Sequence, residues 1–581
     1  MEISGNSPCR LSRGGKIVRC GTILGEERGE WSGVHDSEIQ EFIMMSTFER
    51  RGRKIGMAMG LGLGLLLSGG AFDRLEAAKP EACRASDLCA SGADPCVIAK
   101  NYIVPAGCTF DFGNRDVVLQ KKKTLTISGC DAPVRFLARN FTTQSSSVID
   151  GHNAGSNCGA DVEIVLSGDF VHQGKLDVSG NLTPGSITVS TQGSIEGMGK
   201  LFARATNAAG SGGVIDLGAR GSIRLDHGST IKVSGNSRGN GGKLWIVALG
   251  PVTINQAIDA SAGGSFDVMG GDIWIESATS LQVGTGRSFA LDVSAAGAAF
   301  GGEIDLISGG EMALAQNVTL NLHGGGGKDG FAGDGGRLTV ESAGPLSFGA
   351  LVKAQGGGAG DIGGYGGDIE ITSYGDVEVT NNVNVFGGVP DGDGGDFTLF
   401  TAGNLLLDGK VDCSGDGIDS MGGSIDLEAE GTLTVTRPLD VSGKGFGAGD
   451  IDILASGDTS IEANLLSNGG GDGGDGGFID IDATQANVTI SALVQAIGDA
   501  DGGWGGEIVV TGDRVTIDEA GKLDTRGDGI EGFAENVIEG TGPITIAGTM
   551  EAGNANKIYY GSELPLITGK VTPAPYVEPL P

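Results

Sequence analysis

Two rows of side chains have the residue types and spacing that could support chemistry. Trp245 and Trp274 occupy the same outward position in successive copies of a repeat. Exposed, flat aromatic rings can contact sugar rings, so this pair is a candidate carbohydrate-binding patch for an extracellular glycan or another cell-surface component. The alternative is a cross-strand aromatic pair that is covered by a loop and stabilises a sheet.

The second row is acidic. Asp426, Asp452 and Asp480 occupy one outward position in three successive repeats, where like charges repel. Raised pKa values, solvation or a bound cation would relieve this repulsion. Calcium prefers carboxylate and carbonyl oxygens, so it is the candidate cofactor, and Asp472 and Asp475 in the neighbouring loop could add ligands. The alternative is a solvated acidic face.

Cysteine usage favours an oxidising compartment. An even cluster of six cysteines between residues 83 and 158 predicts three disulfides of undetermined connectivity. A zinc site is the alternative, although the cluster has no Cys-x-x-Cys pair. The six residues are Cys83, Cys89, Cys96, Cys108, Cys130 and Cys158.

Signals for catalysis are weak. His152, His172, His227 and His323 have no motif around them, so we interpret them as lone surface histidines. No nucleophile elbow, phosphate loop or His/Cys metal cluster is recognisable. The longest repeat, at 304–337, is where an active site would be sought. A net charge of −34 would repel phosphates and argues against nucleic acid as a partner.

These side chains must be positioned by a repetitive scaffold. The chain has 109 glycines but only 16 prolines among 581 residues, which disfavours long helices. Apolar-x-apolar triplets recur with a period near 28 from Ile187 to Ile508. There are twelve such triplets. In ten of them a Gly-Gly pair ends two residues before the first apolar residue, as in Gly422-Gly423-Ser424-Ile425. Fixed apolar positions also exclude a disordered glycine-rich polymer.

Each repeat contains three short alternating runs, such as those starting at Ile425, Leu433 and Leu439. Alternation is typical of strands with one buried face, and a single repeat cannot bury that face alone. We therefore predict an all-β, right-handed, single-stranded parallel β-helix of about 14 turns of about 28 residues, with three short strands per turn. Cys413 replaces the valine of an inward position, which predicts a buried free thiol; a reactive cysteine is the alternative.

The chain divides into five predicted segments. Residues 1–43 are interpreted as a gene-model extension or a disordered segment. Residues 44–78 have the basic and apolar parts of a signal peptide, with an uncleaved anchor as the alternative. Residues 79–158 form a disulfide-rich cap and the first turns, and 159–550 form the β-helix. Residues 551–581 are the last turn and a proline-containing tail, which we expect to be disordered from 571 onwards.

The repeat motifs resemble those of bacterial surface proteins. Gly476-Gly477-Phe478-Ile479 resembles the Gly-Gly-Ala-Ile repeat of polymorphic outer-membrane proteins, and the Leu-Asp-Val-Ser-Gly run at 439–443 is similar to turns of filamentous-haemagglutinin-like adhesins. The resemblance covers about 160–550 and implies a right-handed β-helix that is secreted or displayed on cells, often as an adhesin. The regular Phe-x-x-Asn and Asn-Pro-Asn motifs of those families are missing.

Together these features predict an exported protein in the periplasm, on the cell surface or in the medium, with no membrane span after signal removal. We expect a non-catalytic structural or adhesive β-helix that binds glycans. The alternative is a β-helix lyase or glycoside hydrolase that acts on polysaccharide. The enzyme should show one region of irregular insertions with unlike polar residues, whereas the near-uniform loops favour the non-catalytic protein.

Overall fold

The computed structural model describes most of the chain that follows the predicted signal peptide. All described residues belong to one compact unit, Ala71–Pro581. The predicted segments 1–43 and 44–78 lie outside the described residues. The described ranges are 83–152, 157–197, 199–228, 230–264, 267–328, 330–358, 360–471, 473–528 and 534–580.

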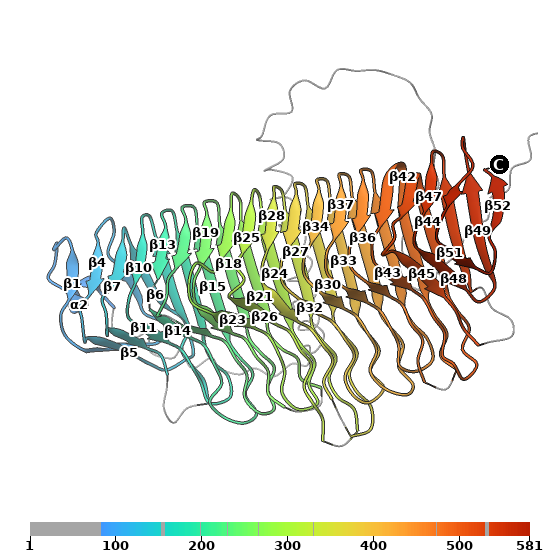
Figure 1. Cartoon of the computed structure of the whole chain (residues 1–581). Coiled ribbons are helices and arrows are strands. Elements are labelled where there is room, and N and C mark those ends of the chain that lie inside the picture. Colours follow the sequence, from blue (N-terminus) through green and yellow to red (C-terminus); the bar gives the residue numbers. More distant parts are fainter. Residues whose placement is uncertain are drawn as a thin grey trace, which may run out of the picture. The chain divides into compact units, whose positions relative to one another are not determined.

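This unit is a parallel β-solenoid of about 15 turns with a spacing of about 28 residues, which confirms the predicted fold class. In one turn, β36 (Ser424–Ala429), β37 (Leu433–Val435) and β38 (Leu439–Asp440) follow one another. Each pairs in parallel with the equivalent strand of the turns before and after it, as Ile425 pairs with Phe397 and Ile451. Figure 1 shows the stacked turns side by side from β1 to β52.

The equivalent strands form three ladders. The first ladder contains β3 (Thr109–Asp111), β6 (Val134–Ala138), β9 (Val162–Leu166), β12 (Ser186–Thr191), β15 (Val214–Ala219), β18 (Lys243–Ala248), β21 (Asp272–Ser277), β24 (Glu303–Ser308), β27 (Arg337–Ser342), β30 (Asp368–Ser373), β33 (Asp396–Thr401), β36, β39 (Asp450–Ala455), β42 (Phe478–Ile490), β44 (Glu507–Ile517), β46 (Glu535–Gly540), β49 (Ala555–Tyr560) and β52 (Tyr576–Pro579). The second contains β1 (Cys96–Ile98), β4 (Val117–Leu119), β7 (Phe141–Thr143), β10 (Phe170–His172), β13 (Ile195–Gly197), β16 (Ile223–Leu225), β19 (Val252–Ile254), β22 (Leu281–Val283), β25 (Met312–Leu314), β28 (Leu346–Phe348), β31 (Val377–Val379), β34 (Leu405–Leu407), β37, β40 (Thr459–Ile461), the later parts of β42 and β44, β47 (Ile544–Ile546) and β50 (Leu566–Ile567). The third contains β2 (Tyr102–Pro105), β5 (Thr124–Ser128), β8 (Val148–Asp150), β11 (Lys175–Asp177), β14 (Lys200–Phe202), β17 (Thr230–Lys232), β20 (Ala257–Asp259), β23 (Phe289–Asp292), β26 (Val318–Asn321), β29 (Leu351–Lys353), β32 (Val383–Asn384), β35 (Val411–Asp412), β38, β41 (Leu465–Leu466), β43 (Leu493–Gln495), β45 (Lys522–Thr525), β48 (Thr549–Ala552) and β51 (Lys570–Thr572).

The core runs along the inside of all three ladders as one continuous apolar cluster. Ile425, Leu433 and Leu439 are fully buried in one turn, because alternate residues of each short strand point inward. Each such side chain contributes about 1.5–3 kcal/mol of burial free energy. Cys413 is a buried free thiol, as predicted, and its pKa is raised by desolvation.

The Gly-Gly pairs lie where successive turns come closest. A Cβ on Gly335 would lie 1.9 Å from the backbone oxygen of Ala354 in the next turn. A Cβ on Gly336 would lie 2.1 Å from the backbone oxygen of Gly302 in the preceding turn. Neither glycine has a positive φ, so close stacking between turns is what requires glycine here.

The N-terminal end is closed by a disulfide-bonded cap. The cap contains α2 (Ala85–Leu88), whose Leu88 is buried against the first turn. The cysteines form three disulfides, as expected from their even number. The pairs are Cys83–Cys108, Cys89–Cys96 and Cys130–Cys158.

The C-terminal tail is ordered, which corrects the expectation of disorder from residue 571 onwards. β51 pairs with β48, and β52 pairs with β49, so the tail adds a final turn. The proline content suggested disorder, but proline is compatible with a terminal strand. Such a strand has no following turn to which its backbone N–H groups must donate hydrogen bonds. Turns at both ends are shorter than in the middle, as Cys96 pairs with Val117 and Thr549 with Lys570. No helix within the described part of the chain is long and apolar enough to cross a membrane.

Candidate functional site

The tryptophan pair lies where the sequence places it. Trp245 of β18 and Trp274 of β21 are directly opposite each other in the first ladder, and both side chains point outward and are half-buried. The indole Nε1 of Trp274 donates a hydrogen bond of 3.1 Å to Glu276 Oε2. The pair therefore presents partly accessible ring surface beside a carboxylate, which fits the candidate carbohydrate patch as well as a stabilising cross-strand pair.

The acidic row also forms as predicted. Asp426, Asp452 and Asp480 are in register on β36, β39 and β42. Desolvation, followed by the charges of Asp426 and Asp450, raises the pKa of Asp452 to about 6. Desolvation and the charge of Asp452 raise the pKa of Asp480 to about 6. Proton uptake is thus one way in which this row reduces its own repulsion.

Calcium binding by this row stays a prediction. Within the described ranges, no group of three or more His, Cys, Asp or Glu side chains is placed to hold a metal ion. Asp475 instead accepts a hydrogen bond of 2.8 Å from the backbone N–H of Trp504 in the next turn. Asp472 lies outside the described residues.

Many other carboxylates connect successive turns. Asp393 and Asp396 accept hydrogen bonds from the backbone N–H groups of Met421 and Ser424, which lie one turn later. In the Leu-Asp-Val-Ser-Gly run, Asp440 accepts a hydrogen bond from the N–H of Ser442 at 3.1 Å. Much of the acidic composition therefore has a structural role at the turns.

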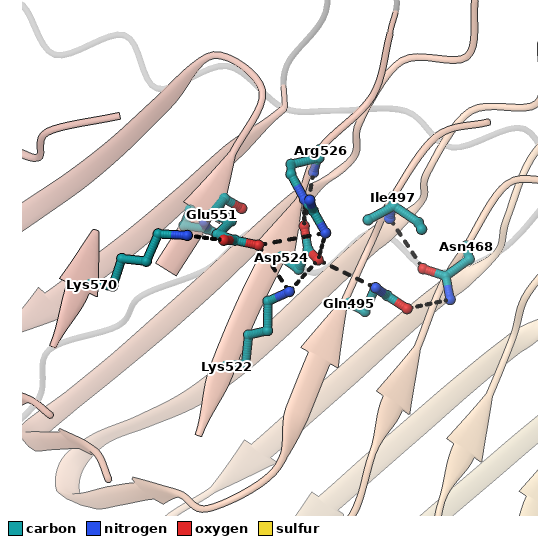
Figure 2. A network of polar contacts seen from close by, with 9 residues as sticks. Asn468, Gln495, Ile497, Lys522, Asp524, Arg526, Glu551 and Lys570 are labelled. Carbon is teal, nitrogen blue, oxygen red and sulfur yellow. Dashed lines mark hydrogen bonds and ion pairs between the residues drawn. The ribbon is translucent and has the colours of Figure 1, made fainter. Parts of the chain in front are cut away.

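A separate charged network joins the last turns of the third ladder (Figure 2). Asp524 is fully buried and lies 2.9 Å from Lys522 Nζ and 2.7 Å from Arg526 Nη2. Burial raises its pKa, but the hydrogen bonds from Arg526 and Lys522 outweigh burial and lower it to about 2. Glu551 lies 2.7 Å from Lys570 and 2.9 Å from Lys522. These groups satisfy one another, so the network stabilises β45, β48 and β51.

One histidine departs from the sequence-based expectation. His172 is buried, with its Nδ1 2.8 Å from Thr143 Oγ1 and its Nε2 3.2 Å from the backbone oxygen of Lys200. Burial lowers its pKa to about 4. It occupies an inward position of β10, so it is a core residue and not a surface histidine. In the longest repeat, His323 Nδ1 lies 2.9 Å from the adjacent backbone oxygen of Gly324.

Sequence reasoning missed a groove of about 570 Å³ that crosses five successive turns beside the first ladder. Its floor consists of consecutive Gly-Gly pairs from Gly270 to Gly395. One wall carries Met269, Phe300, Asp334 and Tyr365, each directly before a Gly-Gly pair. The other wall carries the first residues of five successive strands. These are Asp272, Glu303, Arg337, Asp368 and Asp396.

Comparisons with known proteins add no relative. No protein-family model, curated protein or solved structure matches this chain significantly. The functional argument therefore rests on the geometry of the described residues.

Proposed function

We propose that this chain is an exported, non-catalytic β-solenoid that acts as a structural or adhesive component of a cell surface and binds glycans. Three disulfides in the N-terminal cap are compatible with an oxidising compartment outside the cytoplasm. The stacked turns supply a long, regular scaffold on which binding groups recur at each turn.

The observation that carries the adhesive role is a row of exposed apolar side chains on the loops that lead into the first ladder. We call it the apolar loop row. Phe331 pairs with Ile362 in an isolated parallel bridge. Val389, Ile418 and Phe446 lie in the corresponding loops before β33, β36 and β39 of the next three turns. Large exposed apolar groups are typical of interaction surfaces. The row consists of Phe331 (58% exposed), Ile362 (37%), Val389 (56%), Ile418 (78%) and Phe446 (68%).

Protease treatment of intact cells, combined with an adherence assay, tests this function. We expect the protein to be cleaved on intact cells, and cells with Ile418→Ser and Phe446→Ser to adhere less to glycan-coated surfaces. Leu454→Ser is the matched control, because Leu454 is 47% exposed but lies on the outer face of β39. Full protection from protease, or equal loss with the control, would contradict the proposal.

A polysaccharide-cleaving enzyme is the second candidate, and the groove is the observation that favours it. Asp272 and Glu303 are in register on adjacent strands. Neighbouring strands are about 4.8 Å apart, which is close to the carboxylate separation of about 5–5.5 Å in retaining glycosidases. Release of reducing ends from neutral polysaccharide, lost in Glu303→Gln, would support this candidate over the first.

A further inference from the structure

The groove has a repeating construction that suits an extended ligand. Each of five turns adds glycine from its Gly-Gly pair to the floor and the first residue of a strand to one wall, and four of these turns add a side chain to the other wall. Adjacent turns are about 4.8 Å apart, so five turns give a length of roughly 19 Å along the solenoid. A cavity of this volume lies within the usual range for ligand sites.

The floor is kept low by the packing of the turns themselves. A Cβ at Gly301 would lie 1.9 Å from the backbone oxygen of Leu322, and one at Gly366 would lie 1.8 Å from that of Val385. Close stacking of the turns therefore requires glycine at these positions. As a consequence, the floor of the groove consists of backbone without side chains. The floor N–H groups are already used between turns, as Gly335 N–H donates to the backbone oxygen of Tyr365. Selectivity must therefore come from the two walls.

The walls have different chemistry. Met269 is 54% exposed and Tyr365 is 51% exposed, and Phe300 lies between them with partial exposure. The facing wall is mainly carboxylate. Desolvation raises the pKa of Asp368 in this wall, and also that of Asp334, the one carboxylate of the mainly apolar wall. An occupant must thus offer apolar faces to one wall and hydrogen-bond donors to the other.

Charge restricts the occupant further. The lining contains five carboxylates and one cation, which gives −5 + 1 = −4. The cation, Arg337, is paired with Asp368 at 3.5 Å and with Glu370 at 2.9 Å. Asp272 is likewise paired with Lys243 at 2.6 Å. The carboxylates still outnumber these two cations, so a polyanion such as a uronic-acid polysaccharide would meet net repulsion in the groove.

Spacing favours a glycan over a peptide. An extended peptide places side chains on one face about every 6.7 Å. This spacing does not match the distance of about 4.8 Å between turns, so successive side chains would not meet successive turns. A pyranose ring in a linear chain advances by a length similar to one turn, and it combines apolar C–H faces with hydroxyl donors at its edge.

We propose that this groove binds a linear glycan without acidic groups, either neutral or built from amino sugars. Met269, Phe300 and Tyr365 contact the ring faces, and Asp272, Glu303 and Asp368 accept hydrogen bonds from hydroxyl or amino groups. The assignment rests on the proposed function for its biological meaning, because it specifies the ligand of the same adhesive solenoid.

Calorimetric titration of the purified full chain tests the assignment directly. The probes are hexamers of β-1,4-glucose, N-acetylglucosamine, glucosamine and galacturonic acid, and hexalysine. We expect the first three to bind and the last two not to bind. Tyr365→Ala should weaken binding at least 10-fold, whereas Tyr374→Ala should not, because Tyr374 is 68% exposed outside the groove. Asp368→Asn should weaken glucosamine-hexamer binding more than Glu378→Gln on β31, and circular dichroism should show all variants folded.

Failure of the groove assignment can be distinguished from failure of the proposed function. Absence of binding by all three non-acidic hexamers, preference for the galacturonic-acid hexamer, or an equal loss in Tyr374→Ala would overturn the groove assignment. Groove-dependent binding of hexalysine in place of the glycans would overturn it in favour of a basic peptide. Cleavage of a bound hexamer would support the groove assignment and overturn the non-catalytic function instead. Binding by a protein that intact cells do not expose to protease would also overturn only the proposed function.

Discussion

The acidic row makes the stability of the folded protein depend on pH. The pKa of Asp452 is about 6 in the folded protein, against 3.8 for an ordinary aspartate. This difference corresponds to about 3 kcal/mol, and we reduce it to about 1 kcal/mol because the side chain is exposed and solvent screens the interaction. The folded-state pKa is raised, so the stabilising contribution is full below about pH 3.8 and is lost as the pH rises through about 6.

The free energy of unfolding of Asp452→Asn should therefore be about 1 kcal/mol higher than that of the wild type at pH 7.5. At pH 3.5 the two free energies of unfolding should be equal. Urea titration at each pH, with hydrogen exchange of peptides covering β36, β39 and β42 as the probe, resolves this region in a long repeat array. Glu428→Gln, on the next outward position of β36, is the control.

The same experiment tests calcium. If calcium occupies the row, the wild type should gain stability with calcium and lose it with chelator, and Asp452→Asn should respond less. Equal stability of wild type and variant at pH 7.5, or a variant that is weaker at both pH values, would refute the electrostatic reasoning.

Three further predictions concern the scaffold. The pKa of His172 is lowered to about 4, so its contribution to the free energy of unfolding is fully present above about pH 6.5. This contribution falls by up to about 3 kcal/mol as the pH drops to 4. In urea titrations, His172→Leu should not show this pH dependence. Gly335→Ala should cost roughly 2–3 kcal/mol by urea titration, since its Cβ would strike the backbone of Ala354, whereas Gly218→Ala should be nearly neutral. Asp524→Asn should cost about 2 kcal/mol at pH 7, because the pKa of about 2 gives a contribution present above about pH 3.8, and this difference should shrink as the pH falls towards 2. A His172→Leu variant that keeps the wild-type pH dependence would contradict the first prediction. Urea midpoints equal to that of the wild type, for Gly335→Ala or for Asp524→Asn at pH 7, would contradict the other two.

The fold could be predicted because it depends on period and alternation, which the sequence displays in every repeat. Ile425 and Leu427 are buried in one strand while Asp426 between them points outward, as alternation requires. Register then follows from the Gly-Gly pairs, and it places Trp245 opposite Trp274 and aligns the acidic row. The even number of cysteines predicted disulfides, although their connectivity needed the three-dimensional arrangement.

The groove could not be predicted in the same way, because its walls are irregular from turn to turn. Met269, Phe300, Asp334 and Tyr365 share one position before the Gly-Gly pair but differ in chemistry. A column of that position read from the sequence would have shown three apolar or aromatic residues and one aspartate. The prediction of a surface position for His172 is wrong because the lack of a motif around a histidine does not indicate exposure, whereas the inward position of His172 in β10 buries it.

Export is the premise of the functional account, and the redox state of the cysteines in the native cell tests it most directly. Thiol trapping and mass spectrometry of the protein from its own cells should find the six cap cysteines in disulfides and Cys413 reduced. They should also find a mature chain that lacks the predicted signal at 44–78. A cytosolic protein that retains this segment and has all seven of these cysteines reduced would contradict the account.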